Sequence, residues 1–161
     1  MRGFYIALYS PSSVQKLLDF VKTTYTVDNV IPVIIRPFGA AAQVGVPEAY
    51  KVAYKLSKPL LIFPELADLK NVLKCDVLYY LSEDGERCDF SQLISSAHHK
   101  RVVLAISSGD QEPASRELEG FNMVWLKDVP PGLPSTAITG IIVYEVAKYL
   151  KNISNTSTPL S

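Results

Sequence analysis

Six short apolar runs, separated by segments with helical periodicity, most constrain what this chain can fold into. The apolar runs lie at 3–9, 30–38, 59–63, 75–81, 101–107 and 121–127. The helical patterns lie at 10–25, 46–58, 64–74, 89–100 and 135–150. Runs made almost wholly of Val, Ile and Leu are typical of strands that are covered on both faces. The alternation therefore predicts an α/β fold with a mostly parallel sheet and helices on both faces.

Length and composition indicate one packed domain. The chain has 161 residues, of which 48% are hydrophobic and 20% are charged. These values favour a globular core over disorder. We expect a single domain over residues 1–150 and a flexible tail over 151–161. Two cysteines, Cys75 and Cys88, are too few for a disulfide scaffold, and we expect free thiols.

The charge balance and the apolar runs limit the classes of partner. Sixteen Lys and Arg residues balance sixteen Asp and Glu residues, so the total gives no sign of nucleic-acid binding. Local basic pieces remain at 98–101, Lys55 and Lys58, and each is explained as simply by solvated surface. No apolar run approaches the ~20 residues of a membrane span. Residues 4–9 resemble a strand more than a signal peptide, which favours a cytoplasmic protein.

The final helical segment is unusually apolar. Between Ser135 and Glu145, only Thr139 and Gly140 interrupt its apolar surface after the first turn. A surface helix normally has one apolar stripe about 100° wide. This helix must therefore be covered on more than one side.

Three loops that follow strands are rich in Gly, Pro and small polar residues. They lie at 36–45, 107–120 and 127–136. In open parallel sheets, ligands bind beyond the carboxyl ends of the strands. A helix that begins at Ser135 also directs free N–H groups toward the last loop. We therefore expect a small-molecule site formed by 36–45, 107–111 and 126–136. The chain has no dinucleotide-binding, Walker or nucleophile-elbow motif.

Individual polar residues leave alternatives open. Arg36 ends an apolar run, where it would clamp a phosphate or carboxylate, or pair structurally with Asp or Glu. Glu65 and Asp68, with Lys70, would suit a nuclease-like metal cluster, although surface helix charges explain them better. His98 and His99 are adjacent and lack a third ligand, so we expect no metal.

Three motifs in the loops resemble those of a known family. The first, "NVIPVIIRPFGAAA", contains Asn29, Arg36, Phe38 and Gly39. The second, "VVLAISSGDQEPASRELEG", contains Ser108, Gly109, Asp110, Gln111 and Glu117. The third, "VWLKDVPPGLPSTAITGIIVYE", ends in "IVYE". In this order they resemble the SpoU branch of the SPOUT, or α/β-knot, RNA methyltransferases over residues 28–150. Pro134 stands where the family has Asn, and "SGDQ" replaces Gly-Pro-Glu-Gly.

The resemblance implies a C-terminal trefoil knot, a homodimer and transfer of a methyl group from S-adenosylmethionine to RNA. The implied target is a ribose 2′-hydroxyl of tRNA or rRNA. The implied catalytic residues are Arg36, Glu117, Ser135 and Thr136. The implied cofactor-binding residues are Ile106, Ser107, Ser108, Gly109, Leu126, Lys127, Val129, Leu133, Ser135 and Thr136. Pro134 favours the alternative of an inactive knotted protein that binds RNA or a ligand.

Overall fold

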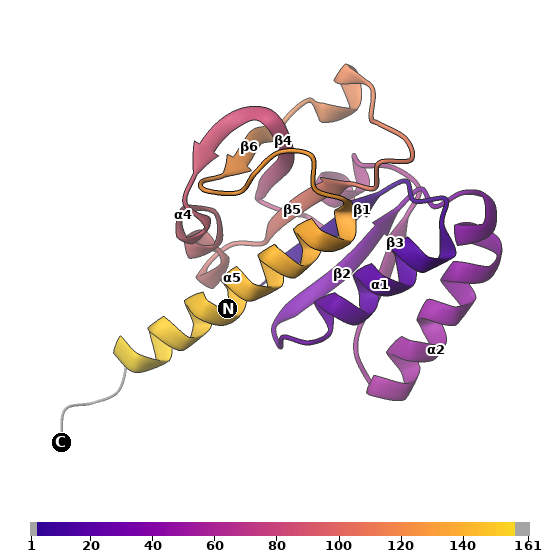
Figure 1. The fold of residues 1–161 in the computed structure, drawn as a ribbon, viewed down its shortest axis with the longest axis horizontal. Coiled ribbons are helices and arrows are strands. Elements are labelled where there is room, and N and C mark those ends of the chain that lie inside the picture. The colour runs from indigo at the N-terminus through magenta and orange to yellow at the C-terminus, as the bar shows by residue number, and fades with distance from the viewer. Residues whose placement is uncertain (1–2, 157–161) are drawn as a thin grey trace.

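The computed structural model describes residues 3–156 and contains one six-stranded sheet (Figure 1). Its strands are β1 (Phe4–Tyr9), β2 (Val30–Ile35), β3 (Leu61–Phe63), β4 (Val77–Cys88), β5 (Val102–Ser107) and β6 (Asn122–Leu126). Their order is β3-β2-β1-β5-β4-β6, and every neighbouring pair is parallel. The predicted parallel sheet is therefore confirmed.

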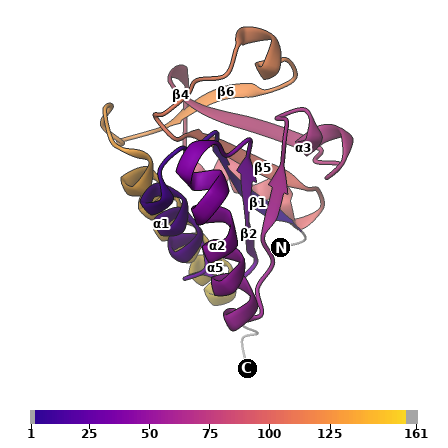
Figure 2. The ribbon, with the colours of Figure 1, turned by 90° about the vertical axis from the view of Figure 1, so that its right-hand side faces the viewer.

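Helices lie on both faces of the sheet, but unequally. They are α1 (Val14–Thr24), α2 (Val46–Leu56), α3 (Asp68–Asn71), α4 (Phe90–Ile94) and α5 (Ser135–Thr156). Figure 2 shows α1, α2 and α5 together on one side, with α1 in contact with both of the others. The opposite face carries the short α3 and the segment around the 3₁₀ turn at Ser115–Leu118. Both layers keep water from the sheet, as the apolar strands require.

The central strands are buried on both sides. All six residues of β1 are buried, and Ile6, Ala7 and Leu8 expose nothing to solvent. Side chains of β1 alternate between the two apolar clusters, so Ile6 packs toward α1 while Ala7 packs toward α3. This burial fixes the register of the sheet and leaves its polar chemistry to the loops.

Strand β4 is longer than the apolar run at 75–81 that predicted it. The strand continues to Cys88 because it pairs with β6 twice, with a bulge between Leu81 and Glu86. Both of these residues pair with Val124. Gly85 makes the bulge possible, since it has no side chain where the chain approaches the backbone of β6.

The helices also differ from the sequence prediction in extent. Segment 36–45, expected as a loop, ends in a π-helical turn at Ala41–Gly45 that leads directly into α2. Small residues permit this, because Gly45 packs beside Leu17 of α1. The expected helix at 64–74 shortens to α3, and the one at 89–100 becomes α4 followed by a 3₁₀ turn at Ser95–His98.

Helix α5 is only partly covered by its own chain. Ile138, Ile142 and Val146 are buried against the core, whereas Tyr144 exposes 63% of its surface. The helix continues to Thr156, so residues 151–156 of the expected tail are helical. Residues 157–161 of that tail lie outside the described residues. Threading of α5 through a knot stays a prediction. No helix within residues 3–156 is long and apolar enough to cross a membrane.

Replacing Gly85 by Ala should destabilise the fold. The added methyl group would lie 2.6 Å from the backbone nitrogen of Val124 and 2.7 Å from the carbonyl carbon of Met123. We expect a loss of roughly 1–3 kcal/mol in the free energy of unfolding, because backbone atoms must move. Urea denaturation measures it. Glu86→Gln is the control, since it changes an exposed side chain of the same bulge and adds no methyl group against β6. It should stay within about 0.5 kcal/mol of wild type.

Candidate functional site

The carboxyl ends of the parallel strands carry most of the polar side chains that the sequence singles out. Ser10 follows β1 and Arg36 follows β2, with φ angles of 49° and 46°. Positive φ is uncommon for residues other than Gly. The hydroxyl oxygen of Ser10 lies 3.0 Å from the carbonyl oxygen of Arg36 and 2.9 Å from Oε1 of Gln111, and its one hydrogen can be donated to either. The two strand ends and the loop after β5 are therefore joined at one edge of the sheet.

Arg36 is held by several groups of the protein itself. Its Nη2 donates to Glu117 at 2.7 Å and to Glu65 at 2.5 Å. Its Nη1 donates to the hydroxyl of Tyr9 at 2.9 Å, and its Nε donates to the carbonyl oxygen of Pro64 at 3.2 Å. A guanidinium has five N–H donors, so these four bonds use most of its capacity. Structural pairing, one of the two sequence hypotheses for Arg36, is therefore present.

Glu117 is the centre of this network. Its carboxylate accepts from Arg36, from the Tyr9 hydroxyl at 3.1 Å and from the backbone N–H of Ala114 at 2.7 Å. Partial burial alone would raise the pKa of Glu117, but the Ala114, Arg36 and Tyr9 hydrogen bonds together outweigh burial and lower it. The carboxylate therefore stays ionised and keeps the guanidinium of Arg36 in place.

A second ion pair holds the loop after β5. Lys16 of α1 donates to Asp110 at 2.6 Å and to the carbonyl oxygen of Ser108 at 3.0 Å. Asp110 also accepts the backbone N–H of Ser12 at 2.9 Å. Burial opposes ionisation of Asp110, but the Lys16 and Ser12 hydrogen bonds prevail and lower its pKa. No sequence pattern distinguished Lys16 from other polar residues on a surface helix.

A pocket of about 520 Å³ lies between the β4 bulge, the loop after β5 and the start of α5. It collects many of the cofactor-binding residues implied by the resemblance: Ile106, Ser107, Ser108, Gly109, Leu133 and Ser135. It also contains polar residues that sequence reasoning missed: Lys16, Tyr80, Ser82, Glu83, Asp84 and Glu112. The latter group comes from three separate segments, and only folding brings it together. We call this cavity the bulge pocket.

The lining of the bulge pocket is predominantly acidic. Glu83, Asp84 and Glu112 contribute carboxylates, whereas the cation Lys16 is already paired with Asp110. Glu112 accepts from the hydroxyl of Ser107 at 2.5 Å. This balance favours a ligand with positive charge and disfavours an unscreened phosphate chain.

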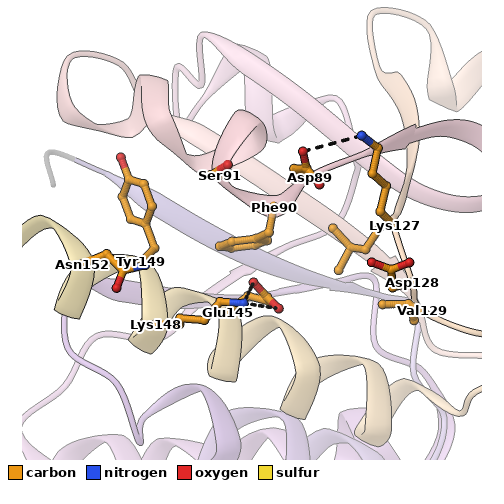
Figure 3. Close-up of a pocket in the computed structure, with 11 residues that line it drawn as sticks. Asp89, Phe90, Ser91, Lys127, Asp128, Val129, Glu145, Lys148, Tyr149 and Asn152 are labelled. Carbon is orange, nitrogen blue, oxygen red and sulfur yellow. Dashed lines mark hydrogen bonds and ion pairs between the residues drawn. The ribbon is translucent and has the colours of Figure 1, made fainter.

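Three of the other cofactor candidates line a different cavity, and Thr136 lines neither. Leu126, Lys127 and Val129 border a pocket of about 310 Å³ between α4, the end of β6 and α5. Figure 3 shows Lys127 beside Asp89, whose carboxylate lies 3.6 Å from its amine, and Glu145 beside Lys148. The single expected site is therefore divided between two cavities, because the end of β6 and the start of α5 face different spaces.

Other candidate residues lie apart from the bulge pocket. Arg36 and Glu117 do not line it, and Thr136 is exposed at the start of α5. The carboxylate of Asp68 accepts the backbone N–H of Glu65 at 3.0 Å, so this pair caps a turn. Nε2 of His98 lies 3.0 Å from the hydroxyl of Tyr149. Among residues 3–156, no group of three His, Cys, Asp or Glu side chains could hold a metal ion.

The Glu117 network should make stability depend on acid pH. A carboxyl group whose pKa is lowered on folding stabilises the protein above its unfolded pKa, near 4.5 for Glu, and loses this effect as the pH falls below that value. We therefore expect wild-type stability to fall steeply between about pH 5 and pH 3. The Glu117→Gln variant should be less stable than wild type at pH 7. Its thermal unfolding temperature should also fall less than that of wild type as the pH is lowered.

An exposed carboxylate nearby provides the control for that measurement. Glu119→Gln changes an exposed side chain close to the network and should follow the wild-type curve. Identical pH profiles for wild type and Glu117→Gln would contradict the assigned role of Glu117.

Comparison with known proteins identifies relatives by sequence and by fold. Residues 39–145 match the family described as "RecB-family nuclease (DUF2122)". "Putative type II restriction enzyme ApeKORF2002P" of Aeropyrum pernix is 32% identical over 138 residues, which is 85% of this chain and 88% of that relative. "Putative type II restriction enzyme MjaORF1200P" of Methanocaldococcus jannaschii is 31% identical over 96 residues, which is 58% of this chain and 66% of that relative.

Solved structures with a similar fold carry different names. The SpoU methyltransferase AviRb from Streptomyces viridochromogenes has a TM-score of 0.69 at 10% identity. The match covers 96% of this chain and 61% of the AviRb chain. A structure described as "Structural insights into the 2-OH methylation of C/U34 on tRNA" has a TM-score of 0.68 at 17% identity. The match covers 94% of this chain and 92% of the chain in that structure. The expected SPOUT-like fold is thus confirmed, and by sequence the chain belongs to the family described as RecB-family nuclease (DUF2122).

Proposed function

We propose that the protein is an S-adenosylmethionine-dependent RNA methyltransferase and that the bulge pocket binds the cofactor. The observation that carries this proposal is the acidic pocket at the carboxyl edge of a SpoU-like fold. Within that pocket, Ser107–Gly109 and Leu133–Ser135 form part of the lining. RNA is the proposed substrate because the names of several structural neighbours include RNA methylation.

The residues of the bulge pocket fit this cofactor chemically. When bound, S-adenosylmethionine supplies a methyl group attached to a positively charged sulfur. Carboxylates of Asp84 and Glu112 favour that charge through space. Gly109 has a φ of 81° and no side chain, so a ligand can approach its backbone closely. The cavity, at about 520 Å³, is within the range of small-molecule sites.

Arg36 and its partners provide the proposed contact with RNA. We propose that Arg36 uses its remaining N–H donor to hold a target phosphate or to help activate the ribose 2′-hydroxyl of tRNA or rRNA, with Glu117 positioning the guanidinium. A ribose hydroxyl is a weak nucleophile and needs such help. Ser135 lines the pocket and would orient the target hydroxyl, and Thr136 lies beside it on the exposed side of α5.

A metal-dependent nuclease is the second candidate, and the family description and the names of both relatives favour it. The donor set opposes it. Glu65 is paired with Arg36, and Asp68 accepts a backbone N–H. The carboxylates of the bulge pocket do not form a group that could hold a metal ion among residues 3–156. We therefore prefer methyl transfer.

A homodimer is also proposed, with α5 at its interface. Its uncovered side presents Thr136, Gly140 and Tyr144 on one face, at the i, i+4 spacing of neighbouring turns. Small residues at two of these positions allow another backbone to approach. A second copy packed here would supply the cover that the apolar sequence of α5 requires and its own chain does not provide.

Calorimetric titration with S-adenosylmethionine and S-adenosylhomocysteine tests the cofactor proposal. We expect one-to-one binding of both ligands. The double variant Asp84→Asn, Glu112→Gln should bind S-adenosylmethionine with roughly tenfold lower affinity, because it removes the attraction between these carboxylates and the sulfonium. It should affect the neutral S-adenosylhomocysteine much less.

Variants in the other cavity show which pocket is used. Asp128→Asn and Lys148→Gln remove charges from the cavity of Figure 3 and should leave both affinities unchanged. If only these two variants lost affinity for the ligands, the cofactor site would be assigned to the cavity of Figure 3. Absence of binding, with Mg²⁺-dependent cleavage of DNA or RNA, would support the nuclease. Binding without methylation of any RNA would support the inactive binding protein.

Replacing Tyr144 tests the dimer. Tyr144 exposes 63% of its surface, and the amine of Lys148 lies 5.5 Å from the centroid of its ring. Tyr144→Asp should leave the monomer folded but place a charge in the interface, so sedimentation should shift from dimer to monomer. Tyr54→Asp, at an exposed tyrosine of α2, should remain dimeric. A monomeric wild-type protein would refute the proposed interface.

A further inference from the structure

The exposed side of α2 carries an uncommon combination of aromatic and basic side chains. Tyr54 exposes 89% of its surface and Tyr50 exposes 48%, although large hydrophobic side chains are usually covered. The two residues are one helical turn apart, so they share one face of α2. Lys51 and Lys55 follow them directly in sequence, and Lys58 lies just beyond the helix. We call these five residues the α2 tyrosine face.

The charges on this face leave a cation available to a ligand. Lys58 is committed to the protein, since its amine lies 2.6 Å from the carbonyl oxygen of Tyr25 and 3.6 Å from Asp28. Lys51 pairs with Glu48 at 3.1 Å, but both side chains are largely exposed, and such a pair contributes little. Lys55 is exposed and pairs with no carboxylate in the described part of the chain.

The shape of the surface suits an extended, flat group. A hollow of about 610 Å³ lies against the tyrosines, bordered by Lys55, Lys58 and Leu60. Aromatic rings that stand in solvent beside lysines offer stacking for bases and charge for phosphates. Bases in a duplex are already stacked on one another, so only a single strand can use such rings.

A protein partner explains this face less well. Tyr is enriched at protein–protein interfaces, but Lys is depleted there. A second copy already has a better site, because the uncovered side of α5 combines small residues with Tyr144. Helix α2 lies at the opposite edge of the helical layer from α5, with α1 between them (Figures 1 and 2). A dimer formed through α5 would therefore leave α2 accessible.

We propose that the α2 tyrosine face binds single-stranded RNA, with bases stacked on Tyr50 and Tyr54 and phosphates near Lys51 and Lys55. This inference rests on the proposed function for the choice of RNA over DNA. It differs from the proposed contact at Arg36, because α2 leads away from the carboxyl edge of the sheet toward the start of β3 (Figure 1). The α2 tyrosine face would hold a flanking stretch of the RNA while the target nucleotide lies beside the cofactor in the bulge pocket.

Fluorescence anisotropy with a labelled 12-nucleotide RNA, the matching DNA strand and the RNA duplex tests the proposal. The single RNA strand should bind most tightly. Tyr54→Ala should weaken this binding by roughly tenfold, as expected for one lost stacking contact. Tyr54→Phe keeps the ring and should bind as wild type does. Because Tyr54 is almost fully exposed, neither change should alter thermal stability.

Salt dependence tests the phosphate contact separately. Lys55→Gln should reduce the slope of log affinity against log salt by about 0.7, the value for one phosphate contact on a single strand. Lys70→Gln, an exposed lysine of α3 on the opposite face of the sheet, should leave the slope unchanged.

Several results would overturn the inference. They are unchanged affinity in Tyr54→Ala, equal losses in Tyr54→Ala and Tyr54→Phe, and preference for the duplex or for DNA. A change from dimer to monomer in Tyr54→Ala would assign the face to a second copy instead. Calorimetric binding of S-adenosylmethionine is measured without RNA, so failure at α2 is distinguishable from failure of the cofactor proposal.

Discussion

Burial of β1 on both faces is the constraint on which the rest of the structure depends. Every residue from Phe4 to Tyr9 is buried, and β1 pairs in parallel with β2 and with β5. Such a strand can carry no exposed polar side chain, so chemistry must begin where it ends. Ser10 and Arg36 stand at that boundary, and both adopt positive φ where the chain leaves the sheet. The same edge brings together loops that are far apart in sequence.

The polar groups at this edge separate into two electrostatic environments. On one side, Arg36 is neutralised by Glu65 and Glu117 and fixed by Tyr9. On the other, the bulge pocket keeps an acidic lining, because Asp110 pairs with Lys16, the one cation that lines it among residues 3–156. The first environment is a network of ion pairs and hydrogen bonds. The second is an open cavity whose carboxylates Glu83, Asp84 and Glu112 are not paired with a cation in the described part of the chain. This difference, more than any motif, decides where a cationic ligand would bind.

The name of the family and the names of proteins with a similar fold refer to different chemistries. The family description and the relatives' names refer to nucleases and restriction enzymes, and the fold matches SpoU methyltransferases. The contacts of Glu65 and Asp68 bear on this difference, because both carboxylates are used within the protein. A carboxylate held by a guanidinium or by a backbone N–H has lost part of its capacity to bind a metal. Carboxylates of the bulge pocket also accept hydrogen bonds, Glu83 from the backbone N–H of Gly132 and Glu112 from the hydroxyl of Ser107. Neither is paired with a Lys or Arg side chain in the described part of the chain.

The sequence by itself determined the parallel sheet, because apolar periodicity reports burial directly. It also indicated that polar loops gather at the carboxyl edge of the sheet and that much of α5 is covered. It also placed Ile106–Gly109 and Ser135 near one another, since parallel strands end at the same edge. Only tertiary structure decided that Glu83 and Lys16 line the same cavity and that Lys127 does not. The bulge in β4 depends on what lies opposite Gly85, and a local pattern holds no record of that contact. Side-chain direction and pairing are settled by neighbours distant in sequence, whereas strands and helices are settled largely by neighbours along the chain.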